Sequence, residues 1–335
     1  MVSSDYRALV ECGRGPIADM AMKCEAVLST HSHVGVSVSG GADSDVMVDL
    51  VERVKAVTST DVSYVWFDTG LEYRATRRHI SDLEDRYGIS IEKRRAEMTV
   101  PVSCKRFGQP FMSKHISQLC ERLQRHGFDW QDGTTDELIA RYPRLNTGIK
   151  WWTNANTRTD EPGWFDIGRI KHLKEFMIEN PPWFNISSKC CDYAKKHVSE
   201  SYEKERGVDA MLVGVRKAEG GVRAAHNSCV THTRGIDLYR PLFWLSNADR
   251  RRYVDMFGIH HSDCYEVWGF KRTGCSCCPF GRDLSNELNM LDRYEPNVAR
   301  AARKVFADSY EYTQMFNEFR RKKKIAMEGQ LTLPI

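Results

Sequence analysis

A strand-like run that passes directly through two glycines into a helix-like run limits the possible folds of this chain most strongly. Residues 33–39 (HVGVSVS) are apolar and β-branched, Gly40 and Gly41 follow, and apolar residues then recur at helical spacing as far as Val57. A buried strand that turns abruptly into a helix is typical of the first half of a βαβ unit. The sequence therefore predicts an α/β protein whose sheet begins here.

The rest of the chain continues this alternation, with one interruption. The sequence predicts further strands at 62–67, 89–93 and 209–215 and helices at 72–86 and 192–206. Such alternation favours a parallel sheet with helices on both faces. The interruption is polar and rich in tryptophan, and the end of the chain is helical and charged. We therefore predict four segments: the first half of the core at 1–97, an insertion or cap at 98–188, the second half of the core at 189–282, and a C-terminal helical segment at 283–335.

The turn between the first strand and its helix, residues 39–44 (SGGADS), has the composition of a phosphate-binding loop. Glycines allow backbone N–H groups to approach an anion closely, and the start of a helix adds partial positive charge. The hydroxyls of Ser39 and Ser44 can donate to phosphate oxygens, while Asp43 can orient the loop or act through Mg²⁺. The alternative is an ordinary glycine turn in which Asp43 and Ser44 cap the helix. We expect neither Asp43 nor Ser44 to be a core residue.

Four segments resemble the PP-loop ATP pyrophosphatases. SGGADS resembles their SGGxDS signature, and 67–72 (FDTGLE) resembles the F-x-D-T-G-x-E segment of the sulfonucleotide reductase branch, without the residue between Phe and Asp. Residues 214–223 are similar to G-x-R-x-x-E-S-x-x-R, with Gly220 in place of Ser, and 239–244 to the P-L-x-x-W stretch, one residue shorter here. The resemblance implies a Rossmann-like, doubly wound, mostly parallel sheet of the PP-loop or HUP type, with ATP and Mg²⁺ as ligands.

The same resemblance implies the residues of the site. The implied nucleotide-binding residues are Ser39, Gly40, Gly41, Ala42, Asp43, Ser44, Asp68, Gly70 and Gly214. The implied catalytic residues are Asp43, Ser44, Arg216 and Arg223. Two other nucleotide folds are less favoured. A dehydrogenase needs G-x-G-x-x-G before an acidic residue, and although Asp68 fits the acidic position the glycine spacing is absent. A Walker-type NTPase needs GK[ST] after its glycines, and the loop does not contain it.

Two pairs among the eleven cysteines have metal-ligand spacing. Cys190 and Cys191 are adjacent at the start of a predicted helix, and Cys275 and Cys278 form C-x-x-C. Four thiolates suit a [4Fe-4S] cluster or a closed zinc site. The assimilatory adenylylsulfate reductases, and uncharacterised relatives often carried by phages, show CC followed by C-x-x-C and bind [4Fe-4S]. This resemblance implies a cluster on these four cysteines, with Zn²⁺ as the alternative.

The other cysteines carry weaker signals. Cys277 lies inside the C-x-x-C pair and could replace one ligand. Cys264 and Cys229 could be a ligand or a sulfur carrier, but a loop or buried position is the more common role of a lone cysteine. We interpret the remaining four as packing residues: Cys12, Cys24, Cys104 and Cys120.

The chain departs from the reductases at the residue that performs their chemistry. Those enzymes attack sulfate with a cysteine in a C-terminal E-C-G motif, and here no cysteine follows Cys278. What remains resembles the sulfur-inserting members of the superfamily: tRNA thiolases and the pyrophosphatase component of the Dnd and Ssp DNA phosphorothioation systems. We therefore expect an ATP pyrophosphatase that adenylates a substrate oxygen for sulfur insertion, on a DNA backbone phosphate in preference to RNA or a base. The alternatives are a sulfonucleotide reductase-like enzyme on a small substrate and a non-catalytic nucleotide- and cluster-binding component of a phage-defence complex.

The expected partners follow from that function. They are nucleic acid, a cysteine desulfurase or other sulfur donor, and other proteins of a modification system. The net charge of +4 is too small to indicate nucleic-acid binding by itself, but the basic run 320–324 could contact phosphates, or simply be a solvated helix end. Trp151 and Trp152 could stack an unpaired base, or be core residues. Because no signal peptide or membrane span is visible, we expect a cytoplasmic protein.

Overall fold

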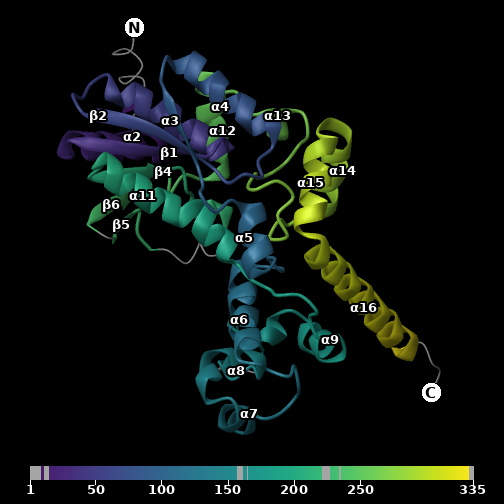
Figure 1. Cartoon of the computed structure of the whole chain (residues 1–335). Helices are drawn as coiled ribbons and strands as arrows, with labels where there is room; N and C mark the ends of the chain where they lie inside the picture. The colour runs from purple at the N-terminus through teal and green to yellow at the C-terminus, as the bar shows by residue number, and fades with distance from the viewer. Residues whose placement is uncertain are drawn as a thin grey trace. The chain divides into compact units, whose positions relative to one another are not determined.

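The computed structural model (Figure 1) describes residues 9–10, 15–156, 161–163, 165–220, 227–233 and 235–331. The chain divides into two compact units, which we call the first and the second unit. The first unit comprises residues 1–99, 193–276 and 290–298, and the second comprises residues 100–192, 277–289 and 299–335. The predicted C-terminal segment is therefore shared between the two units, and most of it joins the predicted insertion.

A six-stranded sheet forms the centre of the first unit, and it confirms the predicted fold class. Its strands are β1 (His33–Val38), β2 (Asp61–Asp68), β3 (Ile91–Arg95), β4 (Ala210–Val213), β5 (Val230–Thr233) and β6 (Ile236–Tyr239). They are ordered β3-β2-β1-β4-β6-β5, and all neighbours are parallel except the hairpin of β5 and β6. The hairpin was not predicted, because its two short strands are mostly polar and half exposed.

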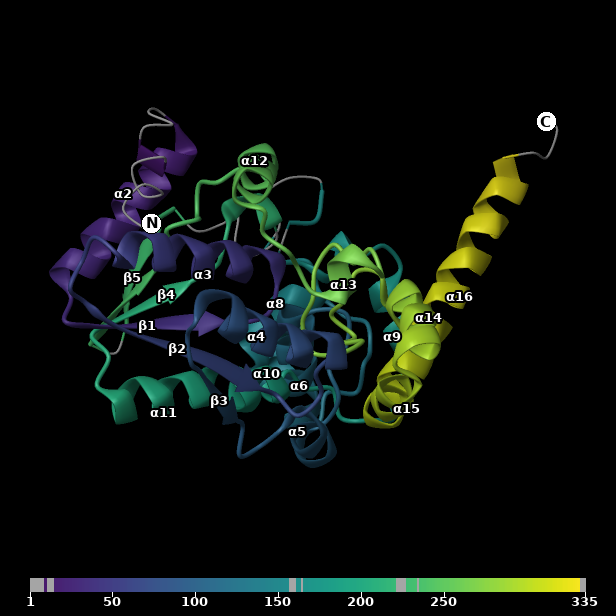
Figure 2. The same cartoon turned by 90° about the horizontal axis from the view of Figure 1, so that it is seen from above.

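Helices cover both faces of this sheet, as predicted. Along β2 the side chains of Tyr64 and Trp66 enter the larger apolar core, whereas Val65 between them packs with Tyr202 on the opposite face. This alternation is that of a strand buried on both sides. The larger core contains residues of α2 (Pro16–Thr30), α3 (Ala42–Lys55), α4 (Arg74–Tyr87) and α12 (Asn247–Phe257), and the smaller contains residues of α11 (His197–Arg206). Figure 2 shows α3 and α11 on opposite sides of β1.

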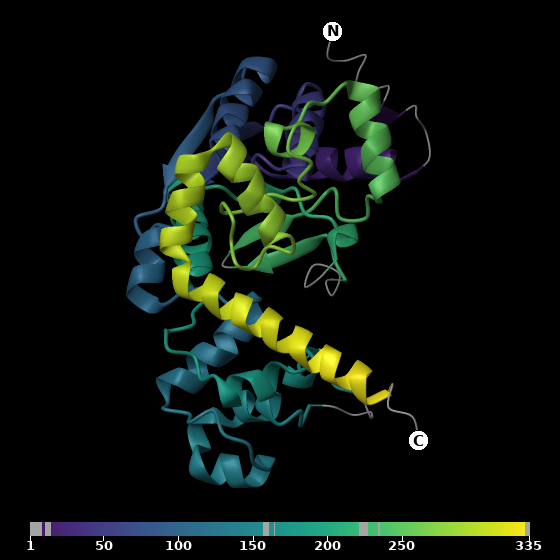
Figure 3. The same cartoon turned by 90° about the vertical axis from the view of Figure 1, so that its right-hand side faces the viewer.

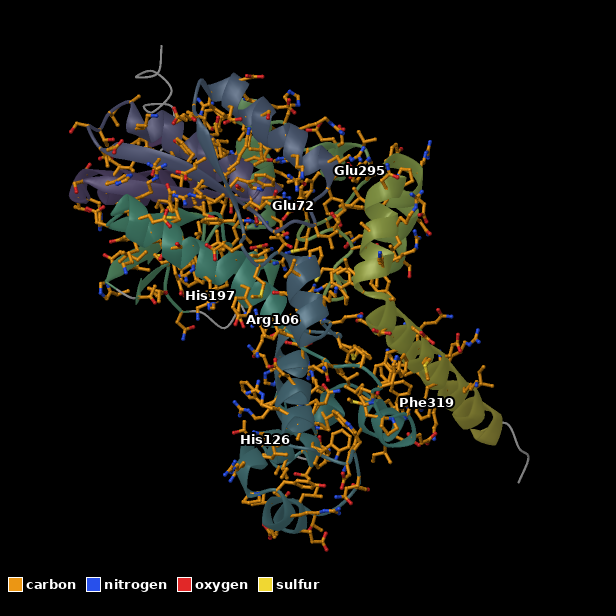
Figure 4. All side chains as sticks on the ribbon, in the orientation of Figure 1. Glu72, Arg106, His126, His197, Glu295 and Phe319 are labelled. Atoms are coloured by element: carbon orange, nitrogen blue, oxygen red, sulfur yellow. The ribbon has the colours of Figure 1, made fainter. Side chains whose placement is uncertain are left out.

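The start of α4 is fixed by a residue far away in the sequence. The buried carboxylate of Glu295, labelled in Figure 4, accepts hydrogen bonds from the backbone N–H groups of Arg74 and Ala75, both at 2.7 Å. A carboxylate at this position satisfies the free N–H groups of the first turn and complements the helix dipole. The cap therefore positions α4, which carries Arg77 and His79, two residues whose contacts are described below.

The second unit is mainly helical. Its elements, in part shared with the first unit, are α5 (Val100–Phe107), α6 (Lys114–Arg125), α7 (Thr135–Arg141), α8 (Asn146–Trp152), α9 (Leu173–Glu179), α10 (Lys189–Cys191), α14 (Leu284–Tyr294), α15 (Pro296–Val305) and α16 (Ala307–Leu331). Tyr312 and Phe316 of α16 are buried among aromatic residues of the insertion, and Phe319 (Figure 4) packs at 5.6 Å from Phe176. Figure 3 shows α16 running alongside the helices of the insertion. In the part of the chain described, no helix is both long and apolar enough to cross a bilayer.

Trp151 and Trp152, for which the sequence left base stacking and a core position open, are core residues. Trp151 is 2% exposed and Trp152 is wholly buried, where its ring contacts Phe128 and Trp130 and its indole N–H donates to the carbonyl of Gln131 at 2.8 Å. The base-stacking interpretation is therefore wrong for both residues. The sequence left the two roles open because an indole serves equally well in a core and at a binding surface.

Candidate nucleotide site and thiol group

The predicted phosphate loop lies where β1 ends in the middle of the sheet. Its neighbours β2 and β4 continue the sheet in opposite directions, so that the loop is at the topological switch point, where α/β proteins bind ligands. Gly40 has φ +67°, a conformation that favours glycine. A Cβ on Gly214, after β4, would be 2.7 Å from the carbonyl oxygen of Asp43. Gly214 is thus needed for close packing of β4 on the loop.

Internal hydrogen bonds hold the loop in shape. The N–H of Ser39 donates to the hydroxyl of Ser44 at 2.8 Å, and the N–H groups of Ser44 and Asp45 donate to the carbonyl of Gly41 at 2.8 and 3.0 Å. Ser44 is only 3% exposed, so the expectation that it is not a core residue is wrong. Its neighbours in sequence gave no sign of this, because the burial comes from the packing of α3 against the sheet.

Asp43 holds two arginines beside the loop. Its Oδ1 is 2.8 Å from Nε of Arg216 and 3.1 Å from a guanidinium nitrogen of Arg250. Arg216 is 3% exposed, and it also donates to the carbonyl of Leu245 and the side chain of Asn247, both at 3.1 Å. The arrangement concentrates positive charge next to the loop, and it makes Asp43 the residue that orients both cations. A role of Asp43 through Mg²⁺ stays a prediction.

Sequence reasoning did not identify Arg250 as a partner of Asp43. It stands in the run Arg250, Arg251 and Arg252 on α12, where only the helical register decides which side chain points to the loop. Arg251 and Arg252 are exposed. The predicted catalytic residue Arg223 lies outside the described residues.

Asp68 and Gly70, predicted to bind nucleotide, shape the turn after β2. Asp68 accepts two hydrogen bonds from the guanidinium of Arg77, at 2.8 and 3.0 Å, and one from the N–H of Gly70 at 2.8 Å. Gly70 has φ +82°, and a Cβ there would be 2.6 Å from Cβ of Thr99. Both residues therefore have local structural tasks, and their contact with a nucleotide stays a prediction.

Thiols gather around Cys190 in the second unit. α10 carries Cys190 and Cys191, and it packs against α5, which carries Cys104. The Cys190 thiol shares hydrogen bonds with those of Cys104 and Cys191 and lies near Cys278. The bond with Cys104, together with burial, raises the pKa of Cys190. Cys104 was predicted to be a packing residue because it has no cysteine near it in the sequence; the contact of the two helices brings it to this group.

The donor chemistry of this group suits a soft metal, although it is not arranged as a coordination site. Three of the four predicted ligands, Cys190, Cys191 and Cys278, belong to it. Cys275 belongs to the first unit, where the next residue, Ser276, donates its N–H to the carbonyl of Leu71 at 2.9 Å. Among the described residues, no group of three or more His, Cys, Asp or Glu side chains is placed to hold a metal ion. Metal binding by the four cysteines stays a prediction.

The other cysteines differ in their surroundings. Cys264 is wholly buried, with its sulfur 3.9 Å from the hydroxyl of Thr76, and burial raises its pKa to about 12. Cys277 is also buried, and its carbonyl accepts a hydrogen bond from the hydroxyl of Tyr310. The burial of Cys264 agrees with the loop or buried position considered for it, whereas the replacement of a ligand by Cys277 stays a prediction. Cys24 and Cys120 are fully buried, Cys229 is half-buried, and Cys12 lies outside the described residues.

Comparisons with solved structures give low similarity over long stretches. The phosphoadenylyl-sulfate reductase of Candida auris, in its phosphate complex, is 13% identical with a TM-score of 0.41, over 81% of this chain and 93% of that one. The U34-tRNA thiolase NcsA of Methanococcus maripaludis, with its [4Fe-4S] cluster, is 14% identical with a TM-score of 0.40, over 90% and 79%. The FMN adenylyltransferase of Candida glabrata, in complex with ATP, is 10% identical with a TM-score of 0.42, over 82% and 67%.

Sequence comparisons are more specific but cover less of the chain. An uncharacterized protein of Methanocaldococcus jannaschii is 32% identical over 129 residues, which are 37% of this chain and 26% of that protein. The chain thus matches about a quarter of the length of this curated relative. Residues 33–127 match the family model of the phosphoadenosine phosphosulfate reductase domain. This range contains the phosphate loop and the turn after β2, and it is the part of the chain for which a family likeness is found.

Proposed function

We propose that this protein is an ATP pyrophosphatase that transfers AMP from ATP to an oxygen of its substrate. The observation that carries the proposal is the phosphate loop 39–44 at the switch point of the sheet, with Arg216 and Arg250 held beside it by Asp43. Backbone N–H groups at the start of a helix can donate hydrogen bonds to a polyphosphate, and two arginines beside them can neutralise its charge. The family match of residues 33–127 includes this loop and supports the same proposal.

The reaction follows from the charges that must be stabilised. The substrate oxygen attacks the α-phosphorus of ATP, the bond from that phosphorus to the α–β bridging oxygen breaks, and pyrophosphate leaves with the electron pair. The negative charge that develops on the leaving group needs fixed positive partners. Arg216 can supply such charge at little reorganisation cost, because Asp43, Leu245 and Asn247 already hold its guanidinium in place. Bound Mg²⁺ would neutralise further phosphate charge.

The second part of the proposal is that sulfur replaces the adenylated oxygen. An adenylated oxygen leaves as AMP, so a sulfur nucleophile can displace it. The thiol group around Cys190 motivates this step, and Cys190, Cys191, Cys275 and Cys278 are the residues that would hold a cluster. A [4Fe-4S] cluster, when bound, would supply iron that can carry sulfur.

We propose nucleic acid as the substrate, and DNA in preference to RNA. The support is the basic run on α16. Arg320, Arg321 and Lys322 are exposed, and Lys323 forms an ion pair with Glu175. The apolar side of α16 packs within the second unit, and the exposed cations lie on the remainder of the helix, where they can contact phosphates. A sulfur donor, such as a cysteine desulfurase, is then a required partner.

The direct test identifies the inorganic product. Purified protein with Mg²⁺, radiolabelled ATP and DNA should release pyrophosphate and AMP, because attack at the α-phosphorus separates the β and γ phosphates together. Thin-layer chromatography resolves both products, and inorganic pyrophosphatase should convert the first to orthophosphate. Orthophosphate and ADP as the sole products would contradict the proposal.

The metal assignment has its own prediction. Protein isolated without oxygen should contain about four irons per chain if the cluster is [4Fe-4S]. Cys190→Ser should lose most of this iron, since it removes the thiol at the centre of the group, and unfolding should occur at a lower temperature. Iron analysis and absorption spectra measure the effect, with the half-buried Cys229→Ser as the matched control. Stoichiometric zinc without iron after anaerobic reconstitution would exclude the cluster.

A further inference from the structure

A buried carboxylate on the first turn of α3 is held between two histidines. Asp45 is wholly buried, and its two oxygens are engaged separately: Oδ1 is 2.9 Å from Nε2 of His79, and Oδ2 is 2.7 Å from Nδ1 of His261. His79 comes from α4, and His261 follows α12, so that three distant segments meet at this carboxylate. Burial by itself lowers the pKa of His79, but the hydrogen bond and charge of Asp45 outweigh it and raise that pKa.

This carboxylate belongs to the turn that shapes the phosphate loop. The N–H of Asp45 and that of Ser44 both donate to the carbonyl of Gly41, and the Ser44 hydroxyl accepts from Ser39. A change in the position of the Asp45 side chain would therefore disturb the turn on which the shape of the loop depends. Asp45 itself is wholly buried, and each of its carboxylate oxygens lies next to a histidine nitrogen.

The segment that provides His261 touches the loop a second time. The ring of His261 packs against that of Tyr265, with centroids 5.8 Å apart, and the hydroxyl of Tyr265 is hydrogen-bonded to Thr273 at 2.9 Å. A Cβ on Gly41 would be 3.2 Å from the Tyr265 hydroxyl and 3.5 Å from the Thr273 hydroxyl. Residues 261–273 thus reach the loop at two places: His261 contacts Asp45, and the hydroxyls of Tyr265 and Thr273 lie next to Gly41.

We propose that Asp45 and His261 are positioning residues for ATP, which hold the phosphate loop in its binding conformation before the nucleotide arrives. The inference rests on the proposed function, because it requires that the loop binds the phosphates of ATP. Its physical basis is preorganisation: donors that are already fixed lose little freedom on binding and need no rearrangement in the reaction. The role of Asp45 is distinct from that of Asp43, because its partners are histidines on the side of α4 and residues 261–273.

The next turn of the same helix supplies a matched control. Asp49 is also wholly buried and also has partners from several elements: Arg53 at 2.7 Å, Tyr253 at 2.8 Å and Tyr87 at 3.0 Å. It lies one turn farther from the loop, and none of these partners touches residues 39–44 in the contacts described. Asp49→Asn should therefore destabilise the protein without a specific effect on ATP.

The experiment compares ATP binding with stability in the full chain. Titration calorimetry with Mg-ATP should show about tenfold weaker binding for Asp45→Asn, by analogy with the loss of residues that orient the ligands of a site. Asp49→Asn should bind within about twofold of the wild type, even where thermal unfolding shows an equal or larger loss of stability. Weakened binding in both variants, or in neither, would overturn the proposal.

A second pair of variants keeps the test valid if Asp45→Asn does not fold. His261→Gln retains an amide N–H for Asp45, whereas His261→Ala removes the donor. Gln should restore most of the ATP affinity that Ala loses, and equal affinity of the two variants would contradict a positioning role.

The measurement of ATP binding also separates this inference from the proposed function. A wild type that binds ATP but releases orthophosphate would refute the proposed reaction alone, and a wild type that binds no ATP would refute both.

Discussion

Asp43→Asn is expected to reduce pyrophosphate release by about a hundredfold or more. Loss of one group that stabilises developing charge typically has an effect of this size. Asparagine keeps the shape of Asp43 but not its charge, so Arg216 and Arg250 lose the anion that holds them beside the loop. Pyrophosphate formation is measured over the first turnover, with ATP and substrate at saturating concentrations. The rate then contains no contribution from product release.

Stability must be measured beside this rate, because Arg216 is buried. Removing one partner of a buried ion pair leaves an uncompensated charge and typically costs about 3 to 5 kcal/mol. The remaining bonds of Arg216 to Leu245 and Asn247 should limit the loss. Asp209→Asn is the matched control: this half-buried aspartate binds the N–H groups of Ser32 and His33 at the opposite end of the sheet. A folded Asp43→Asn protein with the rate of the wild type would contradict the role given to Asp43.

Trp152→Ala is expected to lower the free energy of unfolding by about 3 to 5 kcal/mol. The indole fills the centre of the second unit between Phe128, Trp130 and Trp151, and its N–H satisfies the carbonyl of Gln131. Alanine would leave a cavity and a half-buried carbonyl without its donor. Urea unfolding followed by far-ultraviolet circular dichroism measures the change without depending on tryptophan fluorescence.

Trp183→Ala is the comparison within the same unit. Trp183 is 50% exposed and reaches Asp308 only at 3.5 Å, so its loss should cost less than about 1 kcal/mol. Trp152→Phe should fall between the two, because it keeps an aromatic ring and loses the hydrogen bond. An equal effect of Trp152→Ala and Trp183→Ala would contradict the assignment of Trp152 to the core.

The local sequence was a good guide where a short segment determines its own structure. The apolar, β-branched run at 33–39 became β1 with one residue fewer, and the glycines after it form the turn into α3. A strand, a tight turn and a helix depend on neighbours within a few residues, which the sequence shows directly. The predicted helix 192–206 was right only from His197 onwards, because a π-helical turn, Asp192–Lys196, precedes it. A wider turn of this kind depends on packing that residue propensities do not describe.

By itself the sequence determined the mostly parallel α/β core and the strand, turn and helix that carry the predicted phosphate loop, since both depend on spacing between near neighbours. Only the tertiary structure decided which distant side chains meet. It placed Arg250 on Asp43, His79 and His261 on Asp45, and Cys104 beside Cys190. It also buried Trp151 and Trp152, which the sequence left between two roles. The physical reason is that the register of each helix and the contacts between elements decide which side chains are buried and which of them meet. Neither is visible in the order of residues alone.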